Sequence, residues 1–249
     1  MIKVQNLVKY FGDKIVLDHI SFTVKDGETL VIIGKSGSGK SVLLKLLIGL
    51  LKADSGEIWI NENSITECST KELQKIRTKV GMVFQSGALF DSMTVGENIA
   101  LALKNIKGMR KWDIPSRISE SLVSVGLEGA ENLMPSELFG GMKKRVGVAR
   151  AIAFAPVYRL YDEPTTGLVP VLTDMINRLI LTIQHQKSIT AIIVTHELRI
   201  VQDVADRVIL LHDGKIAFDG LPDKILKSKD PVVQQFITGD STLILEEKE

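Results

Sequence analysis

The chain is predicted to be an α/β protein with a mainly parallel sheet and an inserted helical lobe. Short apolar runs typical of buried strands alternate with helical stretches over much of its 249 residues. A long middle region shows only the three- and four-residue apolar spacing of helices. A glycine-rich loop stands between an apolar run and a helical run. With 45% apolar residues, the chain can bury a sizeable core.

The first part of the chain is predicted to be rich in β-strands. Ile2–Val8 and Val16–Val24 alternate apolar and polar residues, and the turn signal Gly12-Asp13 lies between them. Further strands are expected at 29–33, 56–60 and 80–84. A helix is expected from Lys40, and Ser69 with Glu72 forms a capping box before a helix that ends near Arg77.

The rest of the chain divides into a helical stretch and a return to strands. Helices are predicted over Val95–Leu103, Pro115–Val125, Gly141–Ala153, about 171–186, Lys224–Lys227 and Val232–Ile237. Strands are predicted over 157–161, 189–194, 207–212 and 215–218. We therefore expect one domain over 1–238, with the helical lobe inserted at about 87–155, and a tail over 239–249 that frays.

Gly34 to Ser41 has the spacing G-x-x-x-x-G-K-[ST] of a phosphate-binding loop. An apolar run over 29–33 precedes it and a helical run over 42–48 follows it, which is the context that the motif needs. Backbone N–H groups and a helix N-terminus would face the phosphates, Lys40 would reach the β- and γ-phosphates, and Ser41 would hold Mg²⁺. The flanks disfavour the alternative of a simple Gly/Ser-rich turn.

Adjacent carboxylates end a later apolar strand and suit the second half of a nucleotide site. Asp162 can hold Mg²⁺ directly or through water, and Glu163 can polarise an attacking water. Without the phosphate loop, a solvated turn before Pro164 would be an equally good interpretation. Gln85 and His196 also follow strands, where they could meet the metal or water and the γ-phosphate.

Each of these additional side chains is a weak signal when it is taken alone. Phe11 precedes Gly12 and could stack on a base, but a core or surface role is the default for all three residues. The basic run Lys143-Lys144-Arg145 is expected to be a solvated helix face.

Composition excludes several classes of protein. The formal net charge is +1, so no strong field would recruit a nucleic acid. Cys68 is the only cysteine, which excludes an internal disulfide. No signal peptide and no uninterrupted apolar stretch of membrane-spanning length is visible. If the protein acts at a membrane, we expect other chains to span it.

Taken in order, these motifs resemble those of the ATP-binding cassette family over nearly the whole chain. Gly34–Ser41 matches its Walker A motif, Leu160–Glu163 its Walker B motif, Ser136–Met142 the site of its LSGGQ signature, and Thr165–Pro170 its D-loop. Single positions also match: Gln85 of the Q-loop, the switch histidine His196 and the adenine-stacking Phe11. The resemblance implies a P-loop NTPase fold, with a RecA-like core, an antiparallel β-subdomain and an inserted helical subdomain.

The same resemblance implies an ATPase that uses ATP and Mg²⁺ and works as a head-to-tail homodimer. Each ATP would be held by the phosphate loop of one subunit and the Gly140-Gly141 segment of the other. Glu163 would be the base, with Lys40, Gln85 and His196 also catalytic, and Ser41, Gln85 and Asp162 would hold the metal. The implied nucleotide-binding residues are Phe11, Gly34, Lys35, Ser36, Gly37, Ser38, Gly39, Lys40, Ser41, Val42, Gly140 and Gly141.

A narrower resemblance points to the ATPases of Mce/Mla-type lipid transporters. It rests on Gln85–Val95, on Gly140–Val146 with Met142 where most cassettes carry Gln, and on Val42. In that branch the cargo is phospholipid, and the partners are an integral-membrane permease and an Mce-domain lipid-binding subunit. The resemblance thus implies a peripheral position on the cytoplasmic face of the inner membrane, with closure of the dimer transmitted through Gln85–Asp91.

Three residues depart from the family pattern. Phe139 replaces the signature serine, and Val169 replaces the D-loop aspartate. The resemblance implies that each subunit then lacks a hydroxyl and a carboxylate that would contact the nucleotide site of its partner. Arg159 occupies a normally apolar strand position, where a guanidinium must find a carboxylate or extend to solvent. An alternative function therefore stays open, a nucleotide-gated subunit with little turnover. A cassette ATPase that acts on DNA or ribosomes is disfavoured, because the chain has neither a coiled-coil insertion nor a second cassette.

Overall fold

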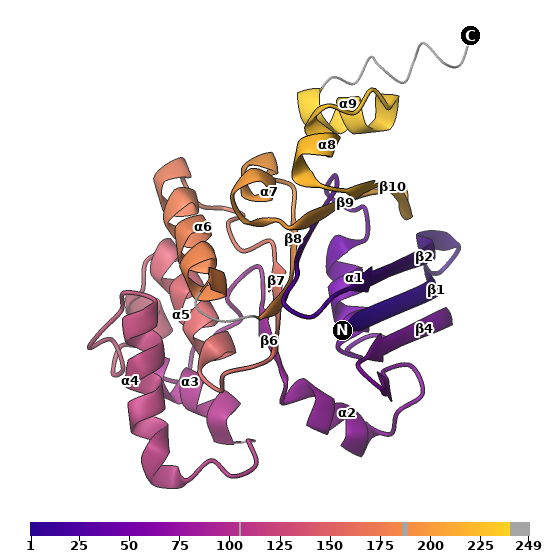
Figure 1. The fold of residues 1–249 in the computed structure, drawn as a ribbon. Coiled ribbons are helices and arrows are strands. Elements are labelled where there is room, and N and C mark those ends of the chain that lie inside the picture. The colour runs from indigo at the N-terminus through magenta and orange to yellow at the C-terminus, as the bar shows by residue number, and fades with distance from the viewer. Residues whose placement is uncertain (105, 186–188, 240–249) are drawn as a thin grey trace. The chain divides into compact units, whose positions relative to one another are not determined.

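The computed structural model describes residues 1–104, 106–185 and 189–239. The chain divides into two compact units. Unit 1 consists of Met1–Leu73 and Thr190–Glu249, and unit 2 consists of Gln74–Ile189 (Figure 1). Unit 1 is therefore assembled from the two ends of the chain. The predicted division into a domain over 1–238 with a lobe at 87–155 stays a prediction.

Unit 1 contains an antiparallel sheet with the strand order β2-β1-β4-β5. Its strands are β1 (Ile2–Phe11), β2 (Lys14–Val24), β4 (Ser55–Ile60) and β5 (Asn63–Ser64). Phe11 pairs with Lys14 across the β1–β2 connection, which confirms the turn predicted at Gly12-Asp13. Buried and more exposed residues alternate over Ile20–Val24 of β2, as expected for a sheet with one face against a core, whereas β1 has register shifts and buries both Leu7 and Val8.

A second group of strands in unit 1 is mainly parallel. The central strand β3 (Thr29–Ile33) pairs in parallel with β8 (Thr190–Thr195) on one side and β9 (Arg207–His212) on the other. β10 (Lys215–Gly220) is antiparallel to β9. Every residue of β3 and of β8 is buried, which explains their continuous apolar sequences. The helices of this unit are α1 (Lys40–Leu47), α7 (Leu198–Val204), α8 (Pro222–Leu226) and α9 (Pro231–Thr238).

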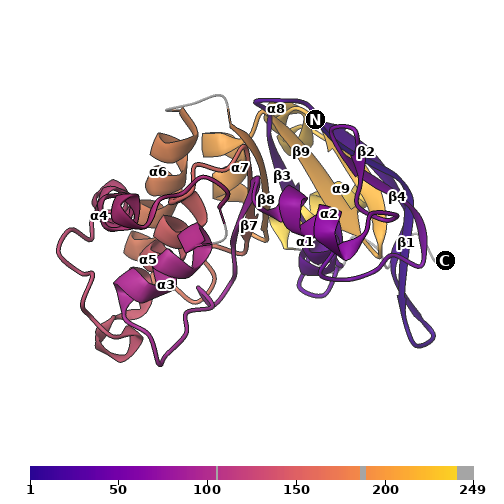
Figure 2. The same ribbon diagram turned by 90° about the horizontal axis from the view of Figure 1, so that it is seen from below.

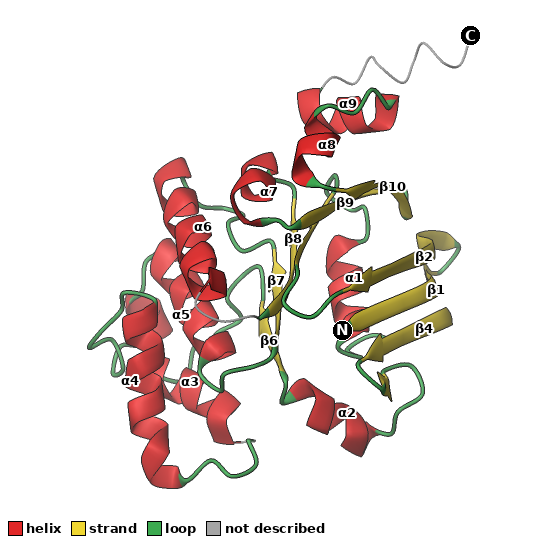
Figure 3. Ribbon diagram, in the orientation of Figure 1, coloured by secondary structure: helices red, strands yellow, loops and turns green. Residues whose placement is uncertain are grey.

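Unit 2 is mainly helical, as Figure 3 shows, with one parallel strand pair. β6 (Val80–Val83) pairs with β7 (Tyr158–Asp162), and Val83 lies beside Tyr161. The α-helices α3 (Val95–Lys104), α4 (Ile114–Ser124) and α5 (Gly140–Ile152) contact one another (Figure 2). Helix α6 (Pro170–His185) contacts α5. Two short 3-10 helices cover Lys111–Asp113 and Pro135–Glu137, and α2 (Thr70–Arg77) spans the boundary between the units.

Most predicted elements are confirmed, with shifts of a few residues at their ends. The predicted capping box is present: Glu72 Oε2 accepts from Ser69 N (2.9 Å), and Ser69 Oγ accepts from Glu72 N (3.4 Å). Helix α7 and strand β5, with seven and two residues, were not predicted from the sequence. The helix predicted at Lys224 begins at Pro222. The last residue of the helix predicted to 186, and the tail from 240, lie outside the described residues.

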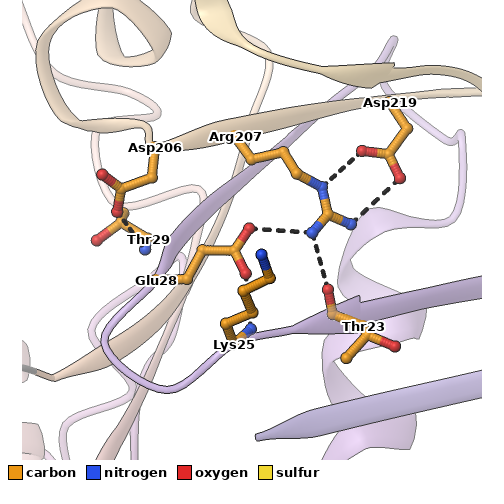
Figure 4. Close-up of polar contacts among 7 residues, drawn as sticks. All are labelled: Thr23, Lys25, Glu28, Thr29, Asp206, Arg207 and Asp219. Carbon is orange, nitrogen blue, oxygen red and sulfur yellow. Dashed lines mark hydrogen bonds and ion pairs between the residues drawn. The ribbon is translucent and has the colours of Figure 1, made fainter.

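Arg207, at the start of β9, joins three segments of unit 1 (Figure 4). Its Nη1 donates to the Thr23 carbonyl on β2 (2.8 Å) and to Glu28 Oε1 (3.0 Å). Its Nε and Nη2 donate to the two Asp219 oxygens on β10 at 2.6 and 3.2 Å. Beside this cluster, the Thr29 N–H donates to Asp206 Oδ2 (2.8 Å). The beginning of β3 is thus held to β2, β9 and β10 by side-chain contacts.

Arg207→Met should lower the free energy of unfolding by about 2 kcal/mol. The physical reason is that the Glu28 carboxylate, with only 10% of its side chain exposed, would lose its ion-pair partner. Urea unfolding checks this. The control is Arg178→Met, because Arg178 is 76% exposed and pairs with Asp174 in α6, where the loss should be below about 0.5 kcal/mol. Equal losses in the two variants would contradict a structural role for the Arg207 cluster.

Candidate functional site

The loop after β3 has the shape that the phosphate-binding motif requires. A side chain at Gly34 would place its Cβ 2.4 Å from the Leu211 carbonyl oxygen and 2.6 Å from Ser38 Oγ. Gly39 has φ +98°, in the left-handed region, and its Cβ would lie 2.8 Å from the Val16 carbonyl oxygen. Only glycine fits these two positions, so the loop closes tightly before α1 begins at Lys40.

Two lysines of this loop have different environments. Lys40 is 5% exposed, and its Nζ donates to the carbonyl oxygens of Gly34 (2.7 Å) and Lys35 (3.0 Å). Its ammonium group is therefore held inside the loop. Lys35 is exposed, and its Nζ donates to Gln235 Oε1 on α9 (3.0 Å). The loop thus directs one lysine inward and ties the other to the C-terminal helix.

A cavity of about 460 Å³ opens beside the loop. This is within the range of small-molecule sites, roughly 300–1,000 Å³. Its lining comes from the loop, from β2 and from the β9–β10 turn, and includes Lys35, Ser36, Gly37, Ser38, Val16 and His212. The predicted loop residues Lys35 to Ser38 therefore share one cavity of unit 1.

Phe11 and His196 also belong to unit 1. Phe11 ends β1 with 49% exposure, and Lys9 Nζ lies 5.3 Å from its ring centroid. An exposed aromatic ring can stack on a planar ligand. His196 is exposed directly after β8, as the predicted strand end requires. Unit 1 therefore carries the loop, the aromatic residue and the histidine.

The acidic pair lies in unit 2 at the end of β7. Asp162 is 4% exposed and Glu163 is 8% exposed, so neither is the solvated turn of the alternative interpretation. Glu163 has φ +46°, a conformation that is uncommon for a residue with a side chain and is found at functional sites. Thr166 Oγ1 donates to Glu163 Oε2 at 2.9 Å and orients that carboxylate.

The prediction of a solvated face for the basic run is wrong for Lys144. Lys144 is 7% exposed, and its Nζ donates to the Gln85 carbonyl oxygen. Burial lowers the pKa of Lys144 and outweighs the opposing effect of the Glu163 and Asp162 carboxylates. Sequence reasoning missed this residue. The available signal was its helical spacing from the buried residues Gly141 and Val148.

Helix α5 holds the segment after Gln85 at two further points. Arg150 Nη1 donates to the Ala88 carbonyl oxygen (2.6 Å), and Nη2 donates to the Gly87 carbonyl oxygen (2.8 Å). Lys144 and Arg150 together bond three backbone carbonyl groups of the 85–88 segment to α5. Gln85 itself has an exposed side chain that can reach a ligand. A shift of α5 would therefore move the Gln85 segment with it.

The predicted signature glycines begin α5, as expected. Gly140 is exposed and Gly141 is buried, where an added Cβ would lie 3.2 Å from Leu172 of α6. Two of the three residues that depart from the family pattern are exposed: Phe139 is 81% exposed and Val169 is 62% exposed. The start of α5 therefore presents an apolar ring where the family pattern has a hydroxyl.

Arg159 satisfies neither alternative that its sequence position required. It is only 7% exposed, so it does not extend to solvent. Among the described residues it pairs with no carboxylate: Nη1 donates to the Ile183 carbonyl oxygen (3.2 Å), and Nε has no partner. Glu120 lines the same cavity as Arg159, but its carboxylate is bonded to Arg117 Nη1 (3.2 Å).

The types of residue predicted to hold Mg²⁺ suit that ion, although each unit supplies them separately. The described residues contain no cluster of three or more His, Cys, Asp or Glu able to hold a metal. Mg²⁺ is typically bound through one or two protein groups together with phosphates and water, so a hydroxyl and one buried carboxylate are suitable donors. Ser41, at the start of α1, and Asp162 are such groups.

These features define a nucleoside-triphosphate-binding protein of the P-loop class. The family model described as "ABC transporter" matches residues 17–166. Among solved structures, the dimeric post-hydrolysis state of the ATP-binding cassette MJ0796 bound to ADP and Pi is similar, with a TM-score of 0.82 and 32% identity. That likeness covers 89% of this chain and 99% of the other. The chain thus belongs to the ABC transporter family and is an ATP-hydrolysing cassette with the predicted P-loop NTPase fold.

Two curated relatives show how varied the similar cassettes are. "Probable ribonucleotide transport ATP-binding protein mkl" of Mycobacterium tuberculosis is 42% identical over 96% of this chain. The chain spans 66% of that relative's length. "Intermembrane phospholipid transport system ATP-binding protein MlaF" of Haemophilus influenzae is 38% identical, over 97% of this chain and 91% of the relative. Among the described residues of this chain, no helix is long and apolar enough to cross a membrane.

Lys144→Met should lower the kcat of ATP hydrolysis about tenfold, because a charged hydrogen bond to the Gln85 backbone is lost beside the acidic pair. ATP affinity should change by less than about twofold, since the phosphate loop is untouched. Lys144→Arg should restore much of the rate. Steady-state turnover and nucleotide titration measure both quantities.

The matched control is Lys143→Met, which removes the adjacent, less buried lysine and should leave kcat nearly unchanged. An equal loss of kcat in the Lys143 and Lys144 variants would show that the rate depends on the positive charge of α5 and not on the hydrogen bond from Lys144 to Gln85.

Proposed function

We propose that this chain is the ATPase subunit of a transporter that moves phospholipid through a separate integral-membrane permease. The observation that carries the proposal is the match to MlaF over 91% of that relative, whose name states intermembrane phospholipid transport. The Gln85–Val95 segment and Met142 in the signature support the same branch. The competing cargo is ribonucleotide, which the name of the Mkl relative states.

In the proposed reaction the phosphate loop binds the triphosphate of ATP. Lys40 places its ammonium group at the β- and γ-phosphates, and the loop N–H groups add hydrogen bonds. Phe11 stacks on the adenine. Glu163, oriented by Thr166, polarises the attacking water, and His196 contacts the γ-phosphate.

Mg²⁺, when bound, would neutralise charge on the phosphates during transfer. We propose that Ser41, Asp162 and Gln85 hold it. The buried position of Asp162 supports this role, since it leaves a carboxylate in a low-dielectric surrounding that favours a cation.

The proposed partners are a second copy of this chain, the permease and an Mce-domain lipid-binding subunit. The proposed position is peripheral, on the cytoplasmic face of the inner membrane. The Gln85–Asp91 segment is the proposed contact with the permease. Asn98 supports it, because this fully buried amide accepts from Phe90 N (2.8 Å) and donates to the carbonyl oxygens of Phe90, Met93 and Thr94. Phe90 is thereby held with 55% of its surface exposed.

The cargo is tested by purifying the complex that forms around the tagged chain and identifying its lipids by mass spectrometry. The complex is then reconstituted, and ATP turnover is measured with phospholipid vesicles or with ribonucleotides. The proposal expects bound phospholipid, and turnover that depends on an intact Lys40. If ribonucleotides stimulate ATP turnover and the complex contains no phospholipid, the cargo is ribonucleotide and not phospholipid.

A second function is favoured by the exposed Phe139 and Val169, which present no hydrogen-bonding group to a partner. In this alternative the subunit binds ATP to gate the permease and turns it over slowly. Steady-state hydrolysis with and without the permease separates the two functions, because only the first requires turnover that the permease stimulates.

Lys40→Ala should abolish ATP binding, because it removes the ammonium group that the loop holds inward. The matched control is Lys35→Ala, since Lys35 is the other cation of the same loop but is directed to Gln235. Its ATP affinity should fall by no more than about threefold. Isothermal titration with ATP measures both variants. Near-normal affinity in Lys40→Ala would remove the loop from the proposed site.

Phe139→Ser together with Val169→Asp should raise kcat, with ATP affinity little changed. One charged hydrogen bond is worth about 1.5–3 kcal/mol, roughly ten- to a hundredfold in dimer closure. The effects of the two changes should couple rather than add, because both act on the same partner contact. Turnover of the single and double variants tests this. Equal rates in the present sequence and the double variant would show that the partner contact is not impaired.

A further inference from the structure

A cavity of about 370 Å³ lies within unit 2, and its lining includes none of the residues proposed to bind nucleotide or metal. Three helices and the start of β7 line it, so it is formed by packed elements and not by one loop. Its volume is within the range of small-ligand pockets, roughly 300–1,000 Å³. The lining is mixed, and its apolar part includes Ile152, Pro156, Val157, Ile183 and Ile189.

The polar part of the lining contains one unpaired charge. Arg159 lines the cavity with 7% of its surface exposed, and its Nε has no hydrogen-bond partner in the described structure. Its Nη1 bonds to the Ile183 carbonyl oxygen (3.2 Å), and the Tyr161 hydroxyl lies near the guanidinium, but neither partner carries a carboxylate. Arg117 also lines the cavity, but its Nη1 bonds to Glu120 Oε2 (3.2 Å), so these two charges cancel. Among the lining residues that the structure describes, the net charge facing the cavity is therefore that of Arg159.

A buried guanidinium without a carboxylate is costly, and buried charges in proteins are generally paired. The planar fork of arginine binds a carboxylate through two parallel hydrogen bonds. Burial lowers the pKa of Arg159, which reflects the same unfavourable surrounding for its charge. A ligand with one negative charge would balance the charge of Arg159, and an apolar part of the same ligand would pack against the apolar side chains of the lining.

We propose that the cavity lined by Arg159 binds an organic monocarboxylate with an aliphatic chain of medium length, that is, a medium-chain fatty acid. The carboxylate bonds to the Arg159 guanidinium, and the chain packs against Ile152, Pro156 and Ile183. Ser124, at the exposed end of α4, lies at the rim. The proposal is independent of the cargo and of the nucleotide site.

Isothermal titration of the full chain with sodium octanoate tests the proposal. Wild-type protein should bind octanoate saturably at one site. Arg159→Leu, which introduces an ordinary strand residue, should bind it at least about tenfold more weakly, because the charged hydrogen bonds are lost. Arg178→Leu is the matched control, since that arginine is exposed and paired on α6, and it should bind as wild type does.

Two further probes separate the parts of the proposal. Octylammonium has the same chain with the opposite charge and should not bind, and inorganic phosphate should bind more weakly than octanoate. Ser124→Phe should block octanoate from the rim while leaving Arg159 in place. ATP affinity, which should stay at the wild-type value in every variant, shows that the fold is kept.

The proposal is overturned if wild type does not bind octanoate, or if Arg159→Leu binds it within about twofold of wild type. It is also overturned if octylammonium binds as well as octanoate, because the charge of Arg159 would then not discriminate between an anionic and a cationic ligand. If phosphate binds more tightly than octanoate, the assignment of an aliphatic ligand is wrong.

Discussion

The tight turn after β3 is the constraint on which the proposed chemistry of unit 1 depends. At Gly34 the backbone passes so close to Leu211 of β9 that no side chain fits, and at Gly39 it passes as close to Val16 of β2. These contacts require that β2, β3 and β9 keep their positions, which the Arg207 cluster secures at the other end of β3. The tight turn also directs Lys40 into the loop. It places the start of α1 where backbone N–H groups can bind phosphates.

In unit 2 the corresponding element is α5. It begins with Gly140-Gly141, it carries the lysine that lies near the acidic pair, and it fixes the backbone from Gln85 to Ala88. Asn98 then holds the next segment, with Phe90 exposed. A rigid path of hydrogen bonds therefore runs from the signature helix to the segment proposed to contact the permease. This path gives the proposed coupling between nucleotide and membrane partner a physical route.

Sequence reasoning succeeded where local rules decide the outcome. The loop glycines, the capping box at Ser69 and the all-buried strand β3 follow from short-range geometry and continuous apolar runs. It failed where tertiary contacts decide. Lys144 belongs to a basic run that the sequence predicts to be solvated. It lies on the buried face of α5, where its ammonium group donates to the Gln85 carbonyl oxygen. For Arg159 the sequence offered two ways to satisfy a charge, and the fold provides neither.

We propose that two copies of this chain close around ATP and that Glu163 drives hydrolysis. Size-exclusion chromatography of Glu163→Gln with ATP and Mg²⁺ tests it most directly. The variant keeps every proposed binding group but lacks the carboxylate, so it should elute as a stable dimer and hydrolyse almost no ATP. Adding Lys40→Ala to the same chain should return it to a monomer. If the Glu163→Gln protein hydrolyses ATP at the wild-type rate, Glu163 does not drive hydrolysis. If it stays monomeric with ATP bound, the chain does not close around ATP as a dimer.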